Sequence, residues 1–74
     1  MTDRARVASL LDGTPVDDLP LPRHTITALR AGDVLTLGQL RGMRDRELLA
    51  LRLFGQGALA DVRSLVPPPP GAGP

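Results

Sequence analysis

Apolar side chains recur at helical spacing in several short stretches of the chain, and glycine or proline separates each stretch from the next. In the first stretch, Val7, Leu10 and Leu11 stand at positions i, i+3 and i+4 before Gly13. This spacing predicts a short helix with one apolar face. We expect the face to pack against the rest of the protein, and association with a partner or a second copy through it is the alternative.

The next segment, residues 15–22, contains three prolines and cannot form a regular helix. Its apolar residues predict that it runs as an ordered segment against the core. A helix is then expected from Pro22 to Gly32, with the glycine in the left-handed conformation that ends many helices. Thr36 is a suitable N-cap for a helix of one to two turns, which Gly42 ends.

Two further helices are expected after Gly42. The first covers about residues 45–51, and we place Leu48, Leu49 and Leu51 in the core together with Phe54. The second follows the glycines at positions 55 and 57. Its apolar residues again recur at helical spacing: Leu59, Val62, Leu65 and Val66.

Composition favours an all-α fold with an aliphatic core. Phe54 is the one aromatic residue and cysteine is absent, so neither a disulfide nor a thiolate metal site stabilises the fold. We predict a compact bundle of about four to five short helices, with the main helical domain in residues 15–66 and a short helix and turn in residues 1–14. Residues 67–74 contain only proline, glycine and alanine, which predicts a disordered tail.

The segment from Leu53 to Leu59 carries the motif with the most physical content. An apolar residue followed by Gly55-Gln56-Gly57, between two helical patterns, is typical of a helix-hairpin-helix turn. The first glycine would permit a sharp bend, and the second would leave the amides of the next helix open to an anion such as a phosphate. The alternative is that both glycines serve only packing or a positive φ.

The order of short landmarks along the chain adds a family resemblance. They follow one another without gaps: Pro15-Val16-Asp17-Asp18-Leu19, Leu29-Arg30-Ala31, Leu37-Gly38-Gln39-Leu40, Glu47-Leu48-Leu49 and Phe54-Gly55. With this combination, the chain from Pro15 to Val66 resembles the C-terminal domain of the bacterial RNA polymerase α subunit. The resemblance implies a four-helix fold in which the start of the first main helix and the hairpin before the last helix face the DNA minor groove.

The resemblance also implies which residues contact DNA, and several of the family's contact side chains are replaced. The family's principal DNA-contacting arginine falls on His24, a nearby asparagine on Thr27, and a lysine and a serine on Gly57 and Ala58. A further basic position is kept at Arg30. We therefore expect weak, largely non-specific binding of the DNA backbone. The residues expected to take part are Arg23, His24, Thr27, Arg30, Gly55, Gln56, Gly57 and Ala58.

The alternative function is a protein-interaction module that kept the fold and lost DNA binding. Its contact surface would be the first helix or an arginine-rich surface that includes Arg52. The resemblance adds an acidic position associated with sigma-factor contact, kept at Asp18, and an activator-facing region near Asp45. The candidates for protein contact are Asp18, Arg41, Arg44, Arg46 and Arg63. The alternative for Arg41, Arg44 and Arg46 is an ordinary solvated face whose charges are satisfied locally.

Charge and residue types narrow the class of function further. A net charge of +1 gives little long-range attraction to nucleic acid. With one histidine and no cysteine, lysine or tyrosine, no nucleophile–base pair can form, so we expect no enzyme, no small-molecule substrate and no cofactor. Asp17 and Asp18 are expected to form turn hydrogen bonds and bind no metal.

No apolar run approaches the roughly 20 residues that a membrane span needs. We therefore expect a cytoplasmic protein without a membrane partner. The expected partners are the DNA backbone, a transcription-related protein, or both. Because the resemblance covers only the C-terminal domain of the polymerase α chain, we further expect a stand-alone, divergent member of the family.

Overall fold

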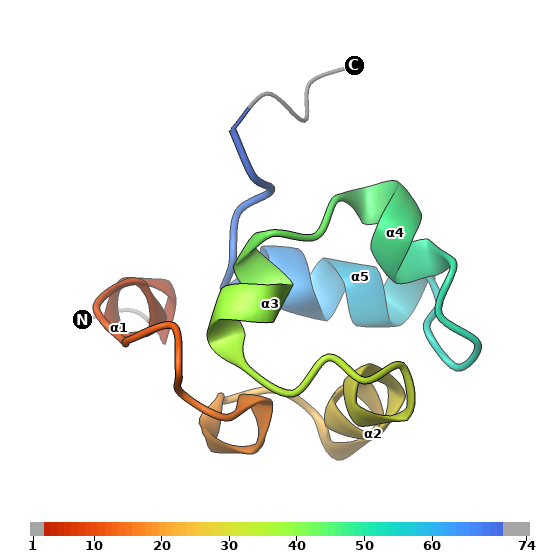
Figure 1. Cartoon of the computed structure of the whole chain (residues 1–74), viewed down its shortest axis with the longest axis horizontal. Coiled ribbons are helices and arrows are strands. Elements are labelled where there is room, and N and C mark those ends of the chain that lie inside the picture. The colour runs from red at the N-terminus through yellow and green to blue at the C-terminus, as the bar shows by residue number, and fades with distance from the viewer. Residues whose placement is uncertain (1–2, 71–74) are drawn as a thin grey trace.

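A computed structural model of the chain describes residues 3–70, which fold into short helices joined by short connections (Figure 1). In chain order the elements are α1 (Asp3–Ala8), the 3-10 turn η1 (Val16–Asp18), α2 (Arg23–Ala31), α3 (Leu37–Arg41), α4 (Asp45–Leu49) and α5 (Gln56–Arg63). The predicted all-α bundle of short helices, with a hairpin before the last helix, is confirmed.

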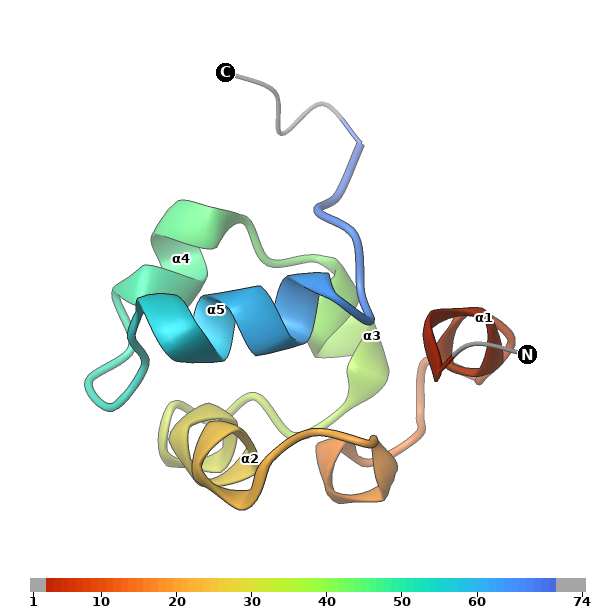
Figure 2. The same ribbon diagram turned by 180° about the vertical axis from the view of Figure 1, so that it is seen from behind.

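Helix α5 lies at the centre of the fold. Helix α2 crosses beneath its N-terminal half, and α4 packs against α5 from the other side (Figures 1 and 2). The core between these helices is aliphatic apart from Phe54, as the composition predicts. The leucines with no exposed surface are Leu29, Leu37, Leu40 and Leu48.

The turn just before the proline-rich segment is bound to α3 by backbone hydrogen bonds. Leu37 N donates to Thr14 O at 2.8 Å, and Gly38 N donates to Asp12 O at 2.8 Å. A Cβ atom at Gly38 would lie 2.7 Å from Asp12 Cβ, so this close approach requires a glycine. Together with the burial of Val16, these bonds order the segment against the core, as predicted.

Helix α3 begins at the predicted N-cap. Thr36 Oγ1 accepts a hydrogen bond from Gln39 N at 3.3 Å, and Gln39 Oε1 accepts one from Thr36 N at 3.1 Å. The two residues therefore form a reciprocal capping box, which satisfies two amides that the first turn leaves without intrahelical acceptors.

The predicted left-handed conformation of Gly32 is wrong. Gly32 has φ −93°, and the left-handed residue is the next one, Asp33, with φ 63°. Glycine at position 32 instead makes room for a side chain, because a Cβ atom there would lie 2.5 Å from Leu51 Cδ2. An aspartate tolerates the left-handed region better than most residues, which permits the bend at position 33.

Not every apolar residue predicted to be buried is buried. Leu49 is 36% exposed, because α4 ends there instead of at residue 51 and Leu48 occupies its inner side. In the N-terminal segment only Val7 enters the core, while Leu10 is partly exposed and Leu11 is 81% exposed. The first helix therefore packs against the rest of the protein through one side chain of the predicted apolar face.

Beyond α5 the chain runs away from the helices (Figure 1). Residues 67–70 form neither helix nor strand, and the remainder of the predicted disordered tail, residues 71–74, lies outside the described residues. Between residues 3 and 70, no helix is long and apolar enough to cross a membrane.

Replacement of a core leucine tests this packing. Leu29→Ala should lower the free energy of unfolding by about 2–5 kcal/mol, because it removes buried methyl groups and leaves a cavity. A domain of this size has a total stability of roughly 3–5 kcal/mol, so far-UV circular dichroism should show a largely unfolded protein at 25 °C. Leu11→Ala, the matched control on the exposed leucine, should keep the urea midpoint. A folded L29A protein with an unchanged midpoint would contradict the core described here.

Candidate nucleic-acid interface

The hairpin turn is open on the side of its two glycines. Gly55 is the N-cap of α5, and its φ of −120° and ψ of −171° are accessible to any residue. A Cβ atom at either Gly55 or Gly57 would meet no other atom within 4 Å. The fold therefore requires glycine at neither position, and the interpretation that they serve only packing or a positive φ is wrong. The sharp bend expected at Gly55 does not depend on glycine either.

The first-turn amides of α5 are also unpaired. Among the described residues, no acceptor binds the backbone N–H of Gln56, Gly57 or Ala58, and the first bond of the helix is Leu59 N to Gly55 O at 3.0 Å. These donors lie at the positive end of the helix dipole. Ala58 is a buried residue, whereas Gln56 and Gly57 are exposed.

Helix α2 presents part of its first two turns to solvent. Arg23, His24 and Thr27 are exposed, whereas Thr25 and Ile26 are buried against the core. All the residues of this helix that the sequence predicted for the site, Arg30 included, are therefore exposed, and their buried neighbours fix the position of the helix.

A carboxylate that sequence reasoning missed connects α2 to α5. Thr25 Oγ1, on a side chain with no exposed surface, donates to Asp61 Oδ2 at 3.0 Å. His24 Nε2 lies 3.5 Å from the same oxygen. Asp61 comes one helical turn after Gly57, so both residues lie on one side of α5. The beginning of α2 and the open turn of α5 therefore border the same surface.

Three of the predicted residues of α2, Arg23, Thr27 and Arg30, line a shallow depression of the surface. Its lining residues are Asp17, Arg23, Ile26, Thr27 and Arg30. The guanidinium of Arg30 forms an ion pair with the Asp17 carboxylate, whereas Arg23 forms no ion pair within residues 3–70. The structure thus brings the predicted basic and hydroxyl side chains together, but one of the two arginines already has an acidic partner.

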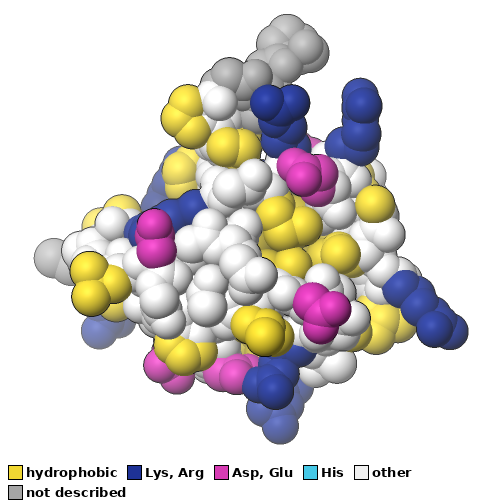
Figure 3. All heavy atoms as spheres, viewed as in Figure 1, with side chains coloured by type: hydrophobic (Ala, Val, Ile, Leu, Met, Phe, Trp, Pro, Cys, Tyr) yellow, Lys and Arg dark blue, Asp and Glu magenta, His cyan; other side chains and the backbone are white. Residues whose placement is uncertain are grey.

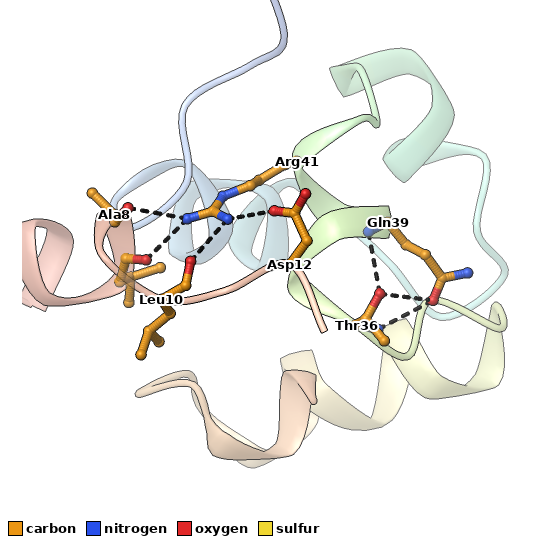
Figure 4. Close-up of polar contacts among 7 residues, drawn as sticks. Ala8, Leu10, Asp12, Thr36, Gln39 and Arg41 are labelled. Carbon is orange, nitrogen blue, oxygen red and sulfur yellow. Dashed lines mark hydrogen bonds and ion pairs between the residues drawn. The ribbon is translucent and has the colours of Figure 1, made fainter. Parts of the chain in front are cut away.

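Arg41, a predicted protein-contact residue, holds the N-terminal helix in place. Its Nη2 donates to Val7 O at 3.1 Å and to Ala8 O at 3.3 Å, and its Nη1 donates to Leu10 O at 3.1 Å (Figure 4). Its guanidinium also forms an ion pair with Asp12 at 2.6 Å. A single side chain therefore donates to two carbonyl groups at the C-terminal end of α1 and to one in the turn that follows it.

Arg63 has a similar internal role near the C-terminal end of α5. Its Nε donates to Asp45 Oδ1 at 2.7 Å, its Nη2 to Met43 O at 2.9 Å and its Nη1 to Val66 O at 3.3 Å. Only 16% of its side chain is exposed. The arginine thus ties the start of α4 to the segment after α5.

The other candidates for protein contact are accessible. Asp18, Arg44, Arg46 and Arg52 are exposed, and none of them forms an ion pair within the described part of the chain. Nor do residues 3–70 bring three or more histidine or acidic side chains together as candidate metal ligands. These accessible residues therefore present separate charged groups to solvent.

The effect of the Arg41 hydrogen bonds on stability can be separated from the effect of its charge. Arg41→Met keeps much of the aliphatic length but removes the donors, and it should lower the free energy of unfolding by about 1–2 kcal/mol. Arg44→Met, which removes the same charge from an exposed arginine without an ion pair, should change stability by less than about 0.5 kcal/mol. Urea denaturation of both variants measures the difference. Equal stabilities would show that Arg41 does not support α1.

Comparison with known proteins identifies relatives of one kind. No family model and no solved structure matches the chain. The chain is 38% identical over 53 residues to the DNA-directed RNA polymerase subunit alpha of Chloroherpeton thalassium, which covers 72% of this chain and 16% of that protein. It is 35% identical over 49 residues to the same protein of Herpetosiphon aurantiacus, a match that covers 66% of this chain and 15% of that protein. It is 32% identical over 50 residues to that of a Roseiflexus species, a match that covers 68% of this chain and 16% of that protein.

The chain thus spans only about 16% of the length of these relatives. Each match covers about two thirds or more of this chain, in keeping with the extent of the resemblance seen in its sequence. The chain is therefore homologous to one segment of the bacterial RNA polymerase α subunit, and the resemblance inferred from its sequence is confirmed.

Proposed function

We propose that this chain is a non-catalytic, transcription-associated module that binds the DNA backbone weakly through its helix-hairpin-helix turn. One observation carries the proposal: the first turn of α5 has unpaired amides and no side chain at Gly55 or Gly57 to shield them. Donors of this kind at a helix N-terminus suit a phosphate oxygen. The depression that contains Arg23 and Thr27 supplies further donors on α2.

The family supports the association with transcription. The relatives are named as subunits of a DNA-directed RNA polymerase, and the chain matches one segment of them. Contact through backbone amides reads no base sequence, because phosphate oxygens are the same at every step of the duplex. The proposed binding is therefore sequence-independent.

Weak binding follows from the distribution of charge. The net charge is +1, and on the face seen in Figure 3 the basic side chains stand apart at the edges, with hydrophobic and acidic side chains between them. The positions that would carry a lysine and a serine in the family carry Gly57 and Ala58, which offer no side-chain donor. We expect a dissociation constant near the non-specific range, about 10⁻⁴ to 10⁻⁶ M.

A second candidate function is contact with an acidic surface of a transcription-related protein. Arg46 on α4, with Arg44 just before the helix and Arg52 after it, is exposed, and none of the three has an acidic partner in residues 3–70. Exposed arginines of this kind suit carboxylate groups of a partner. This surface belongs to α4 and the turn after it, so its binding is separable by mutation from that of the α5 turn.

A pair of opposite charges at Gly57 tests the proposed DNA contact. Both Gly57→Lys and Gly57→Glu should fold, because a Cβ atom at this position meets nothing within 4 Å. The lysine should tighten binding of a short A·T-rich duplex by about three- to ten-fold at low salt and steepen the salt dependence by about 0.9, the value of one added phosphate contact. The glutamate should weaken binding. Fluorescence anisotropy at two salt concentrations measures both effects.

The same two changes at Gly13 are the matched control. Gly13 also has free space for a side chain but lies in the turn after α1. Its variants alter the net charge in the same way and should bind DNA like the unmodified protein. Equal effects of the two lysine variants would show a non-specific influence of net charge and would contradict a phosphate site at the α5 turn.

A further inference from the structure

Two neighbouring acids of η1 face different parts of the surface. Asp17 lines the depression on α2 that Arg23, Thr27 and Arg30 also line. Asp18 lines another depression, between α1 and η1. Although the two residues are adjacent in sequence, only Asp17 lies within the surface proposed to bind a phosphate.

The Asp17 carboxylate is bound to the guanidinium of Arg30, the group that a phosphate would contact. Arg30 Nη1 donates to Asp17 Oδ2, and 56% of the arginine side chain and 46% of the aspartate side chain are exposed. Ion pairs with this degree of exposure contribute little to stability, since water and salt screen them. A backbone phosphate carries the same single negative charge as a carboxylate and likewise presents two strong acceptor oxygens to a guanidinium, so it can replace Asp17 at Arg30 without a large loss of stability.

The carboxylate is held where it competes. Asp17 follows Val16, whose side chain is 1% exposed and whose amide donates to Leu35 O at 2.9 Å. Its own side chain thus extends from an anchored backbone toward the last turn of α2, where Arg30 lies. As long as the pair is closed, Arg23 is the one basic side chain of this depression that has no acidic partner within residues 3–70.

We propose that Asp17 limits the affinity of the DNA-binding surface by competing with DNA phosphate for Arg30. This inference rests on the proposed DNA-binding function and adds an affinity-determining residue to it. Binding then exchanges one anion for another at the same guanidinium: Asp17 Oδ2 leaves, and a phosphate oxygen accepts the Nη1 hydrogen bond in its place. Removal of the Asp17 charge should leave Arg30 free before DNA arrives.

The adjacent aspartate provides a close control. Asp17→Asn and Asp18→Asn raise the net charge equally and differ by one position in the same turn. Asp17→Asn should tighten binding of a short A·T-rich duplex by about two- to five-fold relative to Asp18→Asn, the range expected for one exposed ion pair, with a salt dependence steeper by up to about 0.9. Urea denaturation should show that both variants remain folded.

Variants that lack Arg30 identify the competitor directly. In an Arg30→Met background, Asp17→Asn should no longer improve binding, because the contested guanidinium is gone. If the unmodified protein binds the duplex and D17N binds no more tightly than D18N, competition by Asp17 is wrong while the DNA-binding function stands. If neither the unmodified protein nor any variant, G57K included, binds the duplex at millimolar concentration, both proposals are overturned.

Discussion

The packing of α2 against α5 positions both halves of the proposed DNA-binding surface. The contact combines apolar burial, with Leu29 and Val62 fully inaccessible, and one hydrogen bond from the buried Thr25 to Asp61. A buried hydroxyl without an acceptor would cost about 1–3 kcal/mol, so this bond favours one arrangement of the two helices over others that bury the same leucines. The depression on α2 and the open amides of α5 consequently lie on neighbouring elements.

Two arginines compensate for the small size of the bundle. The chain has no cysteine, and its helices are too short to be stable alone, so each must be fixed by tertiary contacts. Arg41 binds the carbonyl end of α1, and Arg63 connects α4 with the segment after α5. These guanidinium groups donate to backbone carbonyls at the end of α1 and in the segments next to α1, α4 and α5. They are thus structural residues as well as charged ones.

Local signals in the sequence predicted most of the fold, because they depend on nearby residues. Thr36 caps α3 through a partner three residues away, and Leu48 is buried as the helical spacing indicates. Contacts between distant segments could not be predicted in this way. The role of Arg41 depends on α1, about 30 residues earlier in the chain, and Gly32 leaves the space that the Leu51 side chain fills. Leu49 is exposed because α4 ends early.

The candidate site, like the fold, could be predicted only where its signals lie close together in the sequence. The Gly55-Gln56-Gly57 motif located the turn, but only the structure shows that its glycines are free of packing and that Arg30 is paired with Asp17. Asp61 had one signal in the sequence, its place four residues after Gly57 on an amphipathic helix. Its partner Thr25 lies on another helix and gives no local signal.

Mapping of backbone amide shifts during titration with DNA tests the central claim most directly. Isotope-labelled protein is titrated with a short A·T-rich duplex at low salt, and the amide resonances are followed by NMR. Our account predicts shifts at residues 55–58 and along α2 from Arg23 to Arg30, which fade as salt is added. Absence of shifts at millimolar duplex, or shifts confined to Arg44, Arg46 and their neighbours, would contradict a DNA-binding surface at the α5 turn.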